Sequence, residues 1–103
     1  MITMICRYAL QPGITREQAV VMLEQGIPYY QNRTGLIRKY NCIDLDRNEG
    51  LGIYLWTDRA LAEAYFAEVR TVIRDQVGAE PEATYLDTPL VVDNVTGEGQ
   101  VAV

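Results

Sequence analysis

The sequence predicts an α+β domain in which four strands and two helices follow one another in the order β-α-β-β-α-β. Four segments are rich in β-branched, aromatic and other apolar residues, which favour strands. Two longer segments repeat apolar residues at helical spacing, and turn signals separate all six. Right-handed crossovers then place both helices on one face of a four-stranded antiparallel sheet, which is the ferredoxin-like arrangement.

The first half of the chain supplies one strand and one helix. Residues 2–10 are mostly β-branched or apolar and stop at a Pro-Gly turn, so we expect a strand there. Thr15 and Gln18 have the spacing of a capping box, and apolar residues at four-residue intervals follow them. These features predict a helix over about 15–27. Pro28 should end or kink it, leaving an irregular connection or a last displaced turn.

A hairpin occupies the middle of the chain. Residues 35–45 and 51–56 have the apolar and aromatic content of strands, and the polar stretch 46–50 between them predicts the loop. Apolar residues at helical spacing then predict a second helix over about 59–76. Its start can be capped by Asp58 or Thr57, and its end by Gly78.

The last strand is expected over about 83–93, with Pro89 marking an edge position or a bulge. Residues 94–103 are predicted to form a tail or arm. We expect residues 1–103 to form one domain, because no linker, repeat or second composition interrupts the chain.

The expected strand order, 4-1-3-2, has two consequences. Cys6 and Cys42 lie on strands that are not neighbours, so we expect both to be reduced rather than joined in a disulfide. The sheet face opposite the helices has no cover within the chain. A second copy can supply that cover, sheet against sheet, which predicts a homodimer.

Charge and composition exclude several classes of function. A net charge of −5 and a pI near 4.6 argue against nucleic acid and anionic membranes as partners. No apolar run is long enough to cross a bilayer, and the first ten residues lack the pattern of a signal peptide, so we expect a cytoplasmic protein. There is no histidine, and the two cysteines lack metal-site spacing, so no metal site is predicted. Acid–base chemistry must come from Asp, Glu, Tyr, Lys, Cys or the substrate.

Four stretches carry a family resemblance: GLIRKY, GLGIYLW, a helix containing AEAYF, and GAEPEATYLDTPLVVDN. Together, over about residues 35–93, they resemble the small bacterial monooxygenases of the YdhR type. These proteins are similar to the wider group of dimeric α+β barrels that includes the antibiotic-biosynthesis monooxygenases. The resemblance implies a homodimer with a pocket between helices and sheet in each subunit. It also implies an aromatic, polyketide-like substrate that reacts with O2 without metal or flavin.

The resemblance bears on particular residues as well. Trp56 matches a tryptophan that lines the pocket in characterised relatives, whereas Gly52 stands where some of these oxygenases place an asparagine. The haem-degrading branch uses a histidine ligand and is therefore excluded. The fold also hosts isomerases, decarboxylases and proteins of no known activity, so it does not fix the reaction.

Three side chains are candidates for catalysis: Arg38, Trp56 and Asp87. Arg38 either pairs with a carboxylate or reaches into the pocket, where a guanidinium could stabilise an enolate or phenolate. A one-residue shift of register would exchange it with Lys39. Trp56 is either a core indole or an aromatic wall whose N–H polarises a carbonyl. Asp87 is the best-placed carboxylate for a base, although an exposed edge charge is the more ordinary interpretation.

The candidates for substrate binding are mostly tyrosines, of which the chain has seven against one phenylalanine. That imbalance favours a cavity wall that also donates hydrogen bonds, although strand and core packing explain tyrosine as well. Arg7 is an alternative cation for the same oxygen. The residues predicted to bind substrate are Arg7, Tyr40, Tyr54, Tyr65 and Tyr85.

These observations leave three functions open. The first is a homodimeric, cofactor-independent monooxygenase acting on a small aromatic or polyphenolic compound. The second is a non-catalytic homodimer that binds a hydrophobic metabolite. The third is an isomerase or cyclase that uses a Tyr or Asp in the same pocket.

Overall fold

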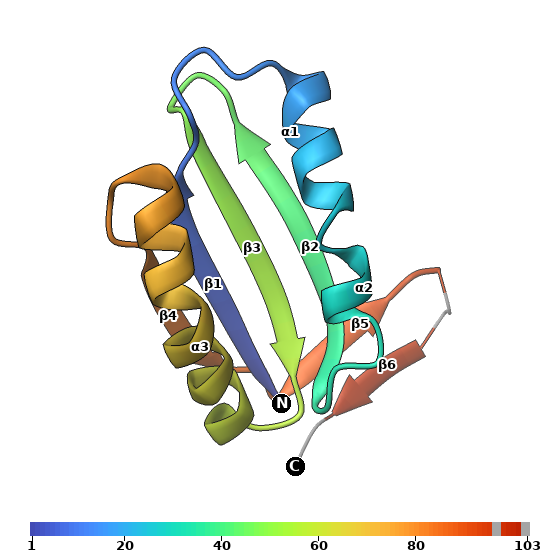
Figure 1. Ribbon diagram of the computed structural model, residues 1–103. Coiled ribbons are helices and arrows are strands. Elements are labelled where there is room, and N and C mark those ends of the chain that lie inside the picture. The colour runs from blue at the N-terminus through green and yellow to red at the C-terminus, as the bar shows by residue number, and fades with distance from the viewer. Residues whose placement is uncertain (96–97, 102–103) are drawn as a thin grey trace.

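The protein is described by a computed structural model that covers residues 1–95 and 98–101. Its main sheet has four antiparallel strands in the order β2-β3-β1-β4, which confirms the predicted order. Helices cover one face of this sheet, and the opposite face, called the bare face below, carries no helix of the described residues (Figure 1). The α+β, ferredoxin-like prediction is therefore confirmed. The four strands are β1 (Ile2–Ala9), β2 (Leu36–Asp44), β3 (Glu49–Trp56) and β4 (Glu82–Asp87).

The first helical region is divided in two. Helix α1 (Arg16–Glu24) begins at the predicted capping box, in which Thr15 and Gln18 exchange hydrogen bonds of 3.0 and 3.2 Å. The chain then turns and forms a second short helix, α2 (Ile27–Tyr30), with Pro28 in its first turn. A proline is tolerated there because the first N–H groups of a helix have no partner within it. The predicted single helix over 15–27 is thus too long, and its displaced last turn is α2.

Helix α3 (Arg59–Val77) is the longest element and matches the predicted second helix. The carboxylate of Asp58 accepts a hydrogen bond of 2.9 Å from the backbone N–H of Leu61, so Asp58 is the cap. Gly78 ends the helix with φ 76°, a left-handed conformation that glycine adopts without strain. No helix within the described residues is long and apolar enough to cross a membrane.

The C-terminal region differs from the prediction. The expected strand over 83–93 stops at Asp87, and Pro89, which has no N–H to donate, leads the chain out of the sheet. Residues beyond it form a separate two-stranded sheet of β5 (Leu90–Asp93) and β6 (Glu98–Val101). The predicted tail therefore contains a paired strand. Residues 96–97 and 102–103 of it lie outside the described part.

Strand register decides which side chains meet the helices. Met4, Cys6, Tyr54 and Trp56 point to the helical face and are buried, and Tyr65 of α3 completes this core. Alternate residues of the same strands point to the bare face. Several apolar side chains are therefore only partly covered by this chain; they include Ile5, Ile53, Leu55 and Leu86.

An irregularity in β2 changes the expected alternation. Leu36 lies opposite Trp56, yet Arg38 lies opposite Leu55, so the register shifts between these two residues of β2. Such a bulge turns the following residues to the other face. Leu36 packs against the core, whereas Arg38 points to the bare face and Lys39 to the helical face.

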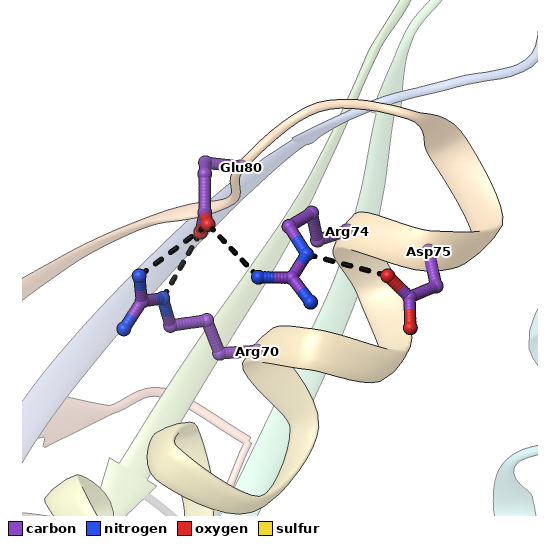
Figure 2. Close-up of polar contacts among 4 residues, drawn as sticks. All are labelled: Arg70, Arg74, Asp75 and Glu80. Atoms are coloured by element: carbon purple, nitrogen blue, oxygen red, sulfur yellow. Dashed lines mark hydrogen bonds and ion pairs between the residues drawn. The ribbon is translucent and has the colours of Figure 1, made fainter.

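Ion pairs fasten the C-terminal end of α3 to the segment that follows it. Glu80 accepts hydrogen bonds of 3.0 and 3.3 Å from Arg70 and lies 3.6 Å from Arg74, which also pairs with Asp75 (Figure 2). All four side chains are partly or largely exposed. The cluster holds the turn between α3 and β4 in place beside the last turns of the helix.

Candidate functional site

A cavity of about 440 Å³ lies between the helices and the sheet. Its floor is the helical face of β1, β2 and β3, and its walls are α1, α2 and the C-terminal end of α3. The lining is mainly apolar, with a few polar groups at the floor. Lining residues include Cys6, Tyr8, Leu10, Met22, Leu23, Tyr30, Lys39, Asn41, Tyr54, Ile73 and Val77.

Lys39 is the cation of this cavity. Its Nζ atom lies 3.5 Å from the centroid of the Tyr30 ring and 4.8 Å from that of Tyr54. In the part of the chain that the structure describes, every ion pair involves an arginine, and Lys39 has no carboxylate partner. Burial lowers the pKa of the Lys39 amine, although the neighbouring Tyr30 opposes this shift. The cavity therefore contains a partly desolvated ammonium, which the ring faces of Tyr30 and Tyr54 and the Tyr30 hydroxyl stabilise.

Three tyrosine hydroxyls form a chain beside Lys39. The hydroxyl of Tyr65 lies 2.7 Å from that of Tyr54 and 2.8 Å from that of Tyr30. Tyr54 comes from β3, Tyr65 from α3 and Tyr30 from α2, so the chain joins the sheet to both helical layers. Arg33 supports it from outside, because its guanidinium lies 4.9 Å from the Tyr65 ring centroid and pairs with Glu68.

A count of the hydroxyl protons shows whether the three tyrosines can donate a hydrogen bond to a ligand. Three hydroxyls carry three protons, and two hydrogen bonds use two of them. Because Tyr65 is fully buried, the third proton is best placed at an end of the chain, on Tyr54 or Tyr30, and both line the cavity. Burial raises the pKa of Tyr54 and of Tyr65 well above the ordinary value. At neutral pH these groups are therefore hydrogen-bond donors and not bases.

Gly52 makes the position of Tyr54 possible. A Cβ atom at Gly52 would lie 2.6 Å from Cε1 and 2.9 Å from the hydroxyl of Tyr54, because the ring folds back over the glycine. The Tyr8 ring occupies the space above Gly50 in the same way. Neither glycine therefore leaves open space beside it, because a tyrosine ring fills each position.

Trp56 lies in the core below the cavity and does not line it. Its indole stacks on the Tyr54 ring at a centroid distance of 6.1 Å and an interplanar angle of 17°, and it packs against Tyr65 at 5.4 Å. The indole N–H is buried and has no hydrogen-bond partner among the described residues. Trp56 thus holds the Tyr54 ring from behind. Of the two interpretations that the sequence allowed, a core indole or a cavity wall, the structure shows the core indole.

The structure brings some of the predicted site residues to the cavity and not others. Tyr54 lines it, and Tyr65 lies directly behind Tyr54. Arg38, Arg7 and Tyr40 point to the opposite, bare face of the sheet. Arg38 donates hydrogen bonds to Tyr40 (3.2 Å) and to Asp93 of β5 (3.3 Å).

The two arginines therefore do not occupy the place expected for a pocket cation. Arg7 pairs with Glu49 at 3.9 Å on the bare face. Arg38 also borders a second hollow of about 280 Å³ at the free edge of β2, which adjoins the cavity and shares Tyr30 and Lys39 with it. The expectation that Arg38 reaches into the pocket assumed unbroken alternation from Leu36, and the bulge in β2 removes that basis.

Asp87 and Tyr85 lie on β4, away from the cavity lining. Asp87 is exposed at the end of the strand, where an edge charge is ordinary. Tyr85 packs against the core, and the guanidinium of Arg59 lies 5.0 Å from its ring centroid. Neither residue is placed to act on a ligand in the cavity.

The sequence analysis did not identify Tyr30, and it named Lys39 only as a register alternative to Arg38. One signal pointed to Lys39: it is the only lysine among the 103 residues, and all other basic residues are arginine. Tyr30 carried no comparable signal, because it follows a proline in a stretch with no clear period. Cys6 also lines the cavity, where burial raises the pKa of its thiol to about 11 and the Lys39 charge partly offsets this.

The cavity contains no obvious metal or acid–base site. None of the residues that line it is an Asp or a Glu, and within the described part of the chain no cluster of three Cys, Asp or Glu side chains could hold a metal ion. What the arrangement can do is hold an anionic oxygen. The ammonium of Lys39 and one tyrosine hydroxyl are available to it.

Comparison with solved structures places this fold. An antibiotic biosynthesis monooxygenase superposes with a TM-score of 0.63 and 13% identity, covering 85% of this chain and 98% of that chain. A Streptomyces coelicolor monooxygenase from the gene ActVA-Orf6, solved in complex with nanaomycin D, gives a TM-score of 0.63 and 12% identity, covering 84% and 86% of the two chains.

A third structure, described as an antibiotic biosynthesis monooxygenase of Deinococcus radiodurans, superposes with a TM-score of 0.62 and 13% identity. It covers 90% of this chain and 97% of that chain. The protein has the fold of the antibiotic biosynthesis monooxygenases. No protein-family model and no curated protein sequence matches the chain. At these identities the likeness establishes the fold and leaves the reaction to the residues of the cavity.

Proposed function

We propose that the protein is a cofactor-independent monooxygenase that binds a small aromatic phenol in the cavity as its phenolate. The observation that carries this proposal is the position of Lys39, a cation that has no carboxylate partner among the described residues and lies at the floor of a mainly apolar cavity. An aromatic ring fits the apolar walls, and its negatively charged oxygen would neutralise the charge of the Lys39 ammonium. Tyr54 or Tyr30 would donate a hydrogen bond to the same oxygen.

The proposed reaction needs no external reductant. The phenolate gives one electron to O2, and the resulting pair combines to form a C–O bond to the ring. Loss of water then breaks the O–O bond and leaves a quinone, so one oxygen atom enters the product and the other leaves as water. The phenol supplies both electrons and both hydrogens of that water. The protein contributes charge stabilisation and positioning of the substrate, and both can lower the barrier substantially without a cofactor.

Two comparisons support the proposal at a coarser level. The structural neighbours are described as monooxygenases, and one of them was solved with nanaomycin D bound. For this chain, a ligand with an ionisable aromatic oxygen is the inference from Lys39 and the tyrosines.

Oxygen consumption with electron-rich phenols tests this function. We expect Lys39→Met to reduce kcat/KM by roughly 100-fold, the usual effect of removing one group that stabilises a developing oxyanion. The matched control is Arg38→Met, which removes the adjacent cation on the opposite face and should leave kcat/KM within about twofold. Equal losses in the two variants, or no oxygen consumption with any phenol, would count against the proposal.

A binding protein is the second candidate, and one observation favours it. The hydroxyls of Tyr54, Tyr65 and Tyr30 are hydrogen-bonded to one another, and the described lining of the cavity includes no carboxylate or histidine to move protons. The same arrangement disfavours an isomerase or cyclase. 4-Nitrophenol separates the candidates, because its phenolate absorbs visible light. Phenolate binding that depends on Lys39 but is never followed by oxygen uptake with any phenol would establish the binding protein.

We also propose that the bare face of the sheet packs against a second copy of the chain. Apolar residues such as Ile53 and Leu55 point to this face and are only partly covered. The β5–β6 hairpin extends beyond the sheet (Figure 1), and it exposes Leu90 and Val92. Packing of two such faces would bury both sets of apolar side chains.

A further inference from the structure

Lys39 differs from the other basic residues of this protein in residue type and in location. It is the only lysine in the sequence, and it lies in the main cavity instead of on the surface, where lysines usually lie. Arginine supplies every other cation. An arginine would serve a purely electrostatic role at least as well, because its charge is permanent and its fork matches anions. Lysine differs in one chemical respect, which is that it can lose its proton and act as a nucleophile.

We propose that Lys39 captures a small aromatic or apolar aldehyde or ketone as an imine within the cavity. This inference goes beyond the proposed oxygenase and does not depend on it. Its structural basis is a lone ε-amine with no carboxylate partner among the described residues, facing mainly apolar walls large enough for one ring. An amine in such surroundings is held in its neutral, reactive form more readily than one in water.

Groups from three elements surround the amine. The rings of Tyr30 on α2 and Tyr54 on β3 favour its charged form, and the Cys6 thiol on β1 lines the same cavity. Burial works in the opposite direction and lowers the pKa of Lys39. Cys6 is a weaker competitor for an electrophile at neutral pH, because burial raises the pKa of its thiol to about 11 and keeps it protonated.

The proposed step is balanced in atoms and electrons. The ammonium first gives its proton to solvent in the cavity. The lone pair of Nζ adds to the carbonyl carbon, a C–N bond forms, and the carbonyl oxygen takes up a proton to give a carbinolamine. That oxygen then leaves as water while C=N forms, so the two N–H hydrogens of the neutral amine depart with it. The free proton at the end of the tyrosine chain, on Tyr54 or Tyr30, is placed to assist the departure of the hydroxyl.

Reductive trapping tests the proposal on the intact protein. Benzaldehyde and cyanoborohydride at pH 7, without oxygen, should convert the imine into a stable benzylamine. Peptide mapping separates modification of Lys39 from modification of the amino terminus. The matched control is Arg47→Lys, which adds a second ε-amine at an exposed loop position while Lys39 stays in place. We expect Lys39 to be modified at least tenfold faster than the amine introduced by Arg47→Lys, because the apolar walls hold the aldehyde beside Lys39 whereas the exposed amine is almost fully protonated and has no pocket.

Modification of Lys39 at the same rate as the surface amine, or more slowly, overturns the proposal. Lys39→Arg provides a second comparison, since it keeps the charge and removes the nucleophile. Trapping at the amino terminus alone is expected in that variant, whose fold is checked by circular dichroism. The two proposals also fail separately. Fast trapping of wild-type Lys39 without oxygen uptake from any phenol contradicts only the oxygenase, and oxygen uptake without trapping contradicts only the imine.

Discussion

The Nζ atom of Lys39 lies 3.5 Å from the centroid of the Tyr30 ring, and this contact joins the edge strand β2 to the short helix α2. It places a cation against the same ring whose hydroxyl begins the chain Tyr30–Tyr65–Tyr54. The charge and the hydroxyl donors are thereby held in one unit. Four separate elements build that unit, so its geometry depends on the whole domain and not on one loop.

Tyr65→Phe should destabilise the protein by about 1–3 kcal/mol, the usual cost of leaving buried polar groups without a partner. The change removes the central hydroxyl, so Tyr54 and Tyr30 each lose their hydrogen bond. Urea denaturation measures the difference in the free energy of unfolding. Tyr40→Phe is the matched control, because Tyr40 is exposed on the bare face, and its effect should stay within about 0.5 kcal/mol. Equal effects would mean that the hydroxyl chain adds no stability.

Gly52→Ala is expected to destabilise the protein by about 1–3 kcal/mol, as overpacking usually does. The new Cβ would lie 2.6 Å from Cε1 of Tyr54, so the ring must move. The same change made in a Tyr54→Leu background should be neutral or stabilising by up to about 1 kcal/mol, because the clashing ring is gone and alanine restricts the unfolded chain more than glycine does. Thermal or urea denaturation of all four proteins completes this cycle. Additive effects would contradict the contact.

The sequence was sufficient to predict the order of the main elements, the strand order and three helix caps. Those features depend on local residue chemistry, such as Thr15 with Gln18 at the start of α1 and Gly78 at the end of α3. Pro89 was recognised as special, but whether it makes a bulge or ends the strand depends on contacts distant in sequence. The separate β5–β6 pairing could not be read from a short polar and glycine-containing stretch.

The site was harder to predict than the helices and strands, because the sheet face to which a side chain points depends on strand register. One extra residue in β2 moves Arg38 to the bare face and Lys39 to the cavity, and no turn residue in the sequence marks that bulge. Tyr54 and Tyr65 were identified from their residue type and helical or strand spacing. Tyr30 joins them only because α2 folds back over the sheet, which is a tertiary effect.

Ile53→Asp should convert a dimer into a monomer if the bare face of the sheet is the interface. Ile53 lies on a central strand and points to that face, so a carboxylate there would be desolvated on packing. Val72→Asp on α3 is the control, since Val72 is exposed on the helical side and its change should leave the dimer intact. Sedimentation velocity at micromolar concentration gives both results. A monomeric wild-type protein would exclude this interface.

Glu80→Gln should lower the melting temperature slightly at pH 7 and have no effect at low pH. Hydrogen bonds from Arg70, with a further contribution from Arg74, hold the pKa of the Glu80 carboxyl below its ordinary value of 4.5 (Figure 2). A lowered pKa means that the unfolded chain takes up the proton first as the pH falls. The stabilisation is therefore complete above the ordinary pKa and disappears as the pH falls through the lower, folded-state value.

The control for this pH dependence is Glu24→Gln, in the last turn of α1. Glu24 is exposed and has no ion pair within the described residues, so its replacement should not produce a destabilisation that disappears on acidification. Calorimetric melting of the three proteins at several pH values between neutrality and acid measures the effect. Because the Glu80 cluster holds the last turns of α3, which carry Ile73 and Val77 of the cavity wall, Glu80→Gln should also weaken binding of 4-nitrophenolate more than Glu24→Gln does. A melting difference that persists in acid would mean that the carboxylate charge is not what stabilises this end of the helix.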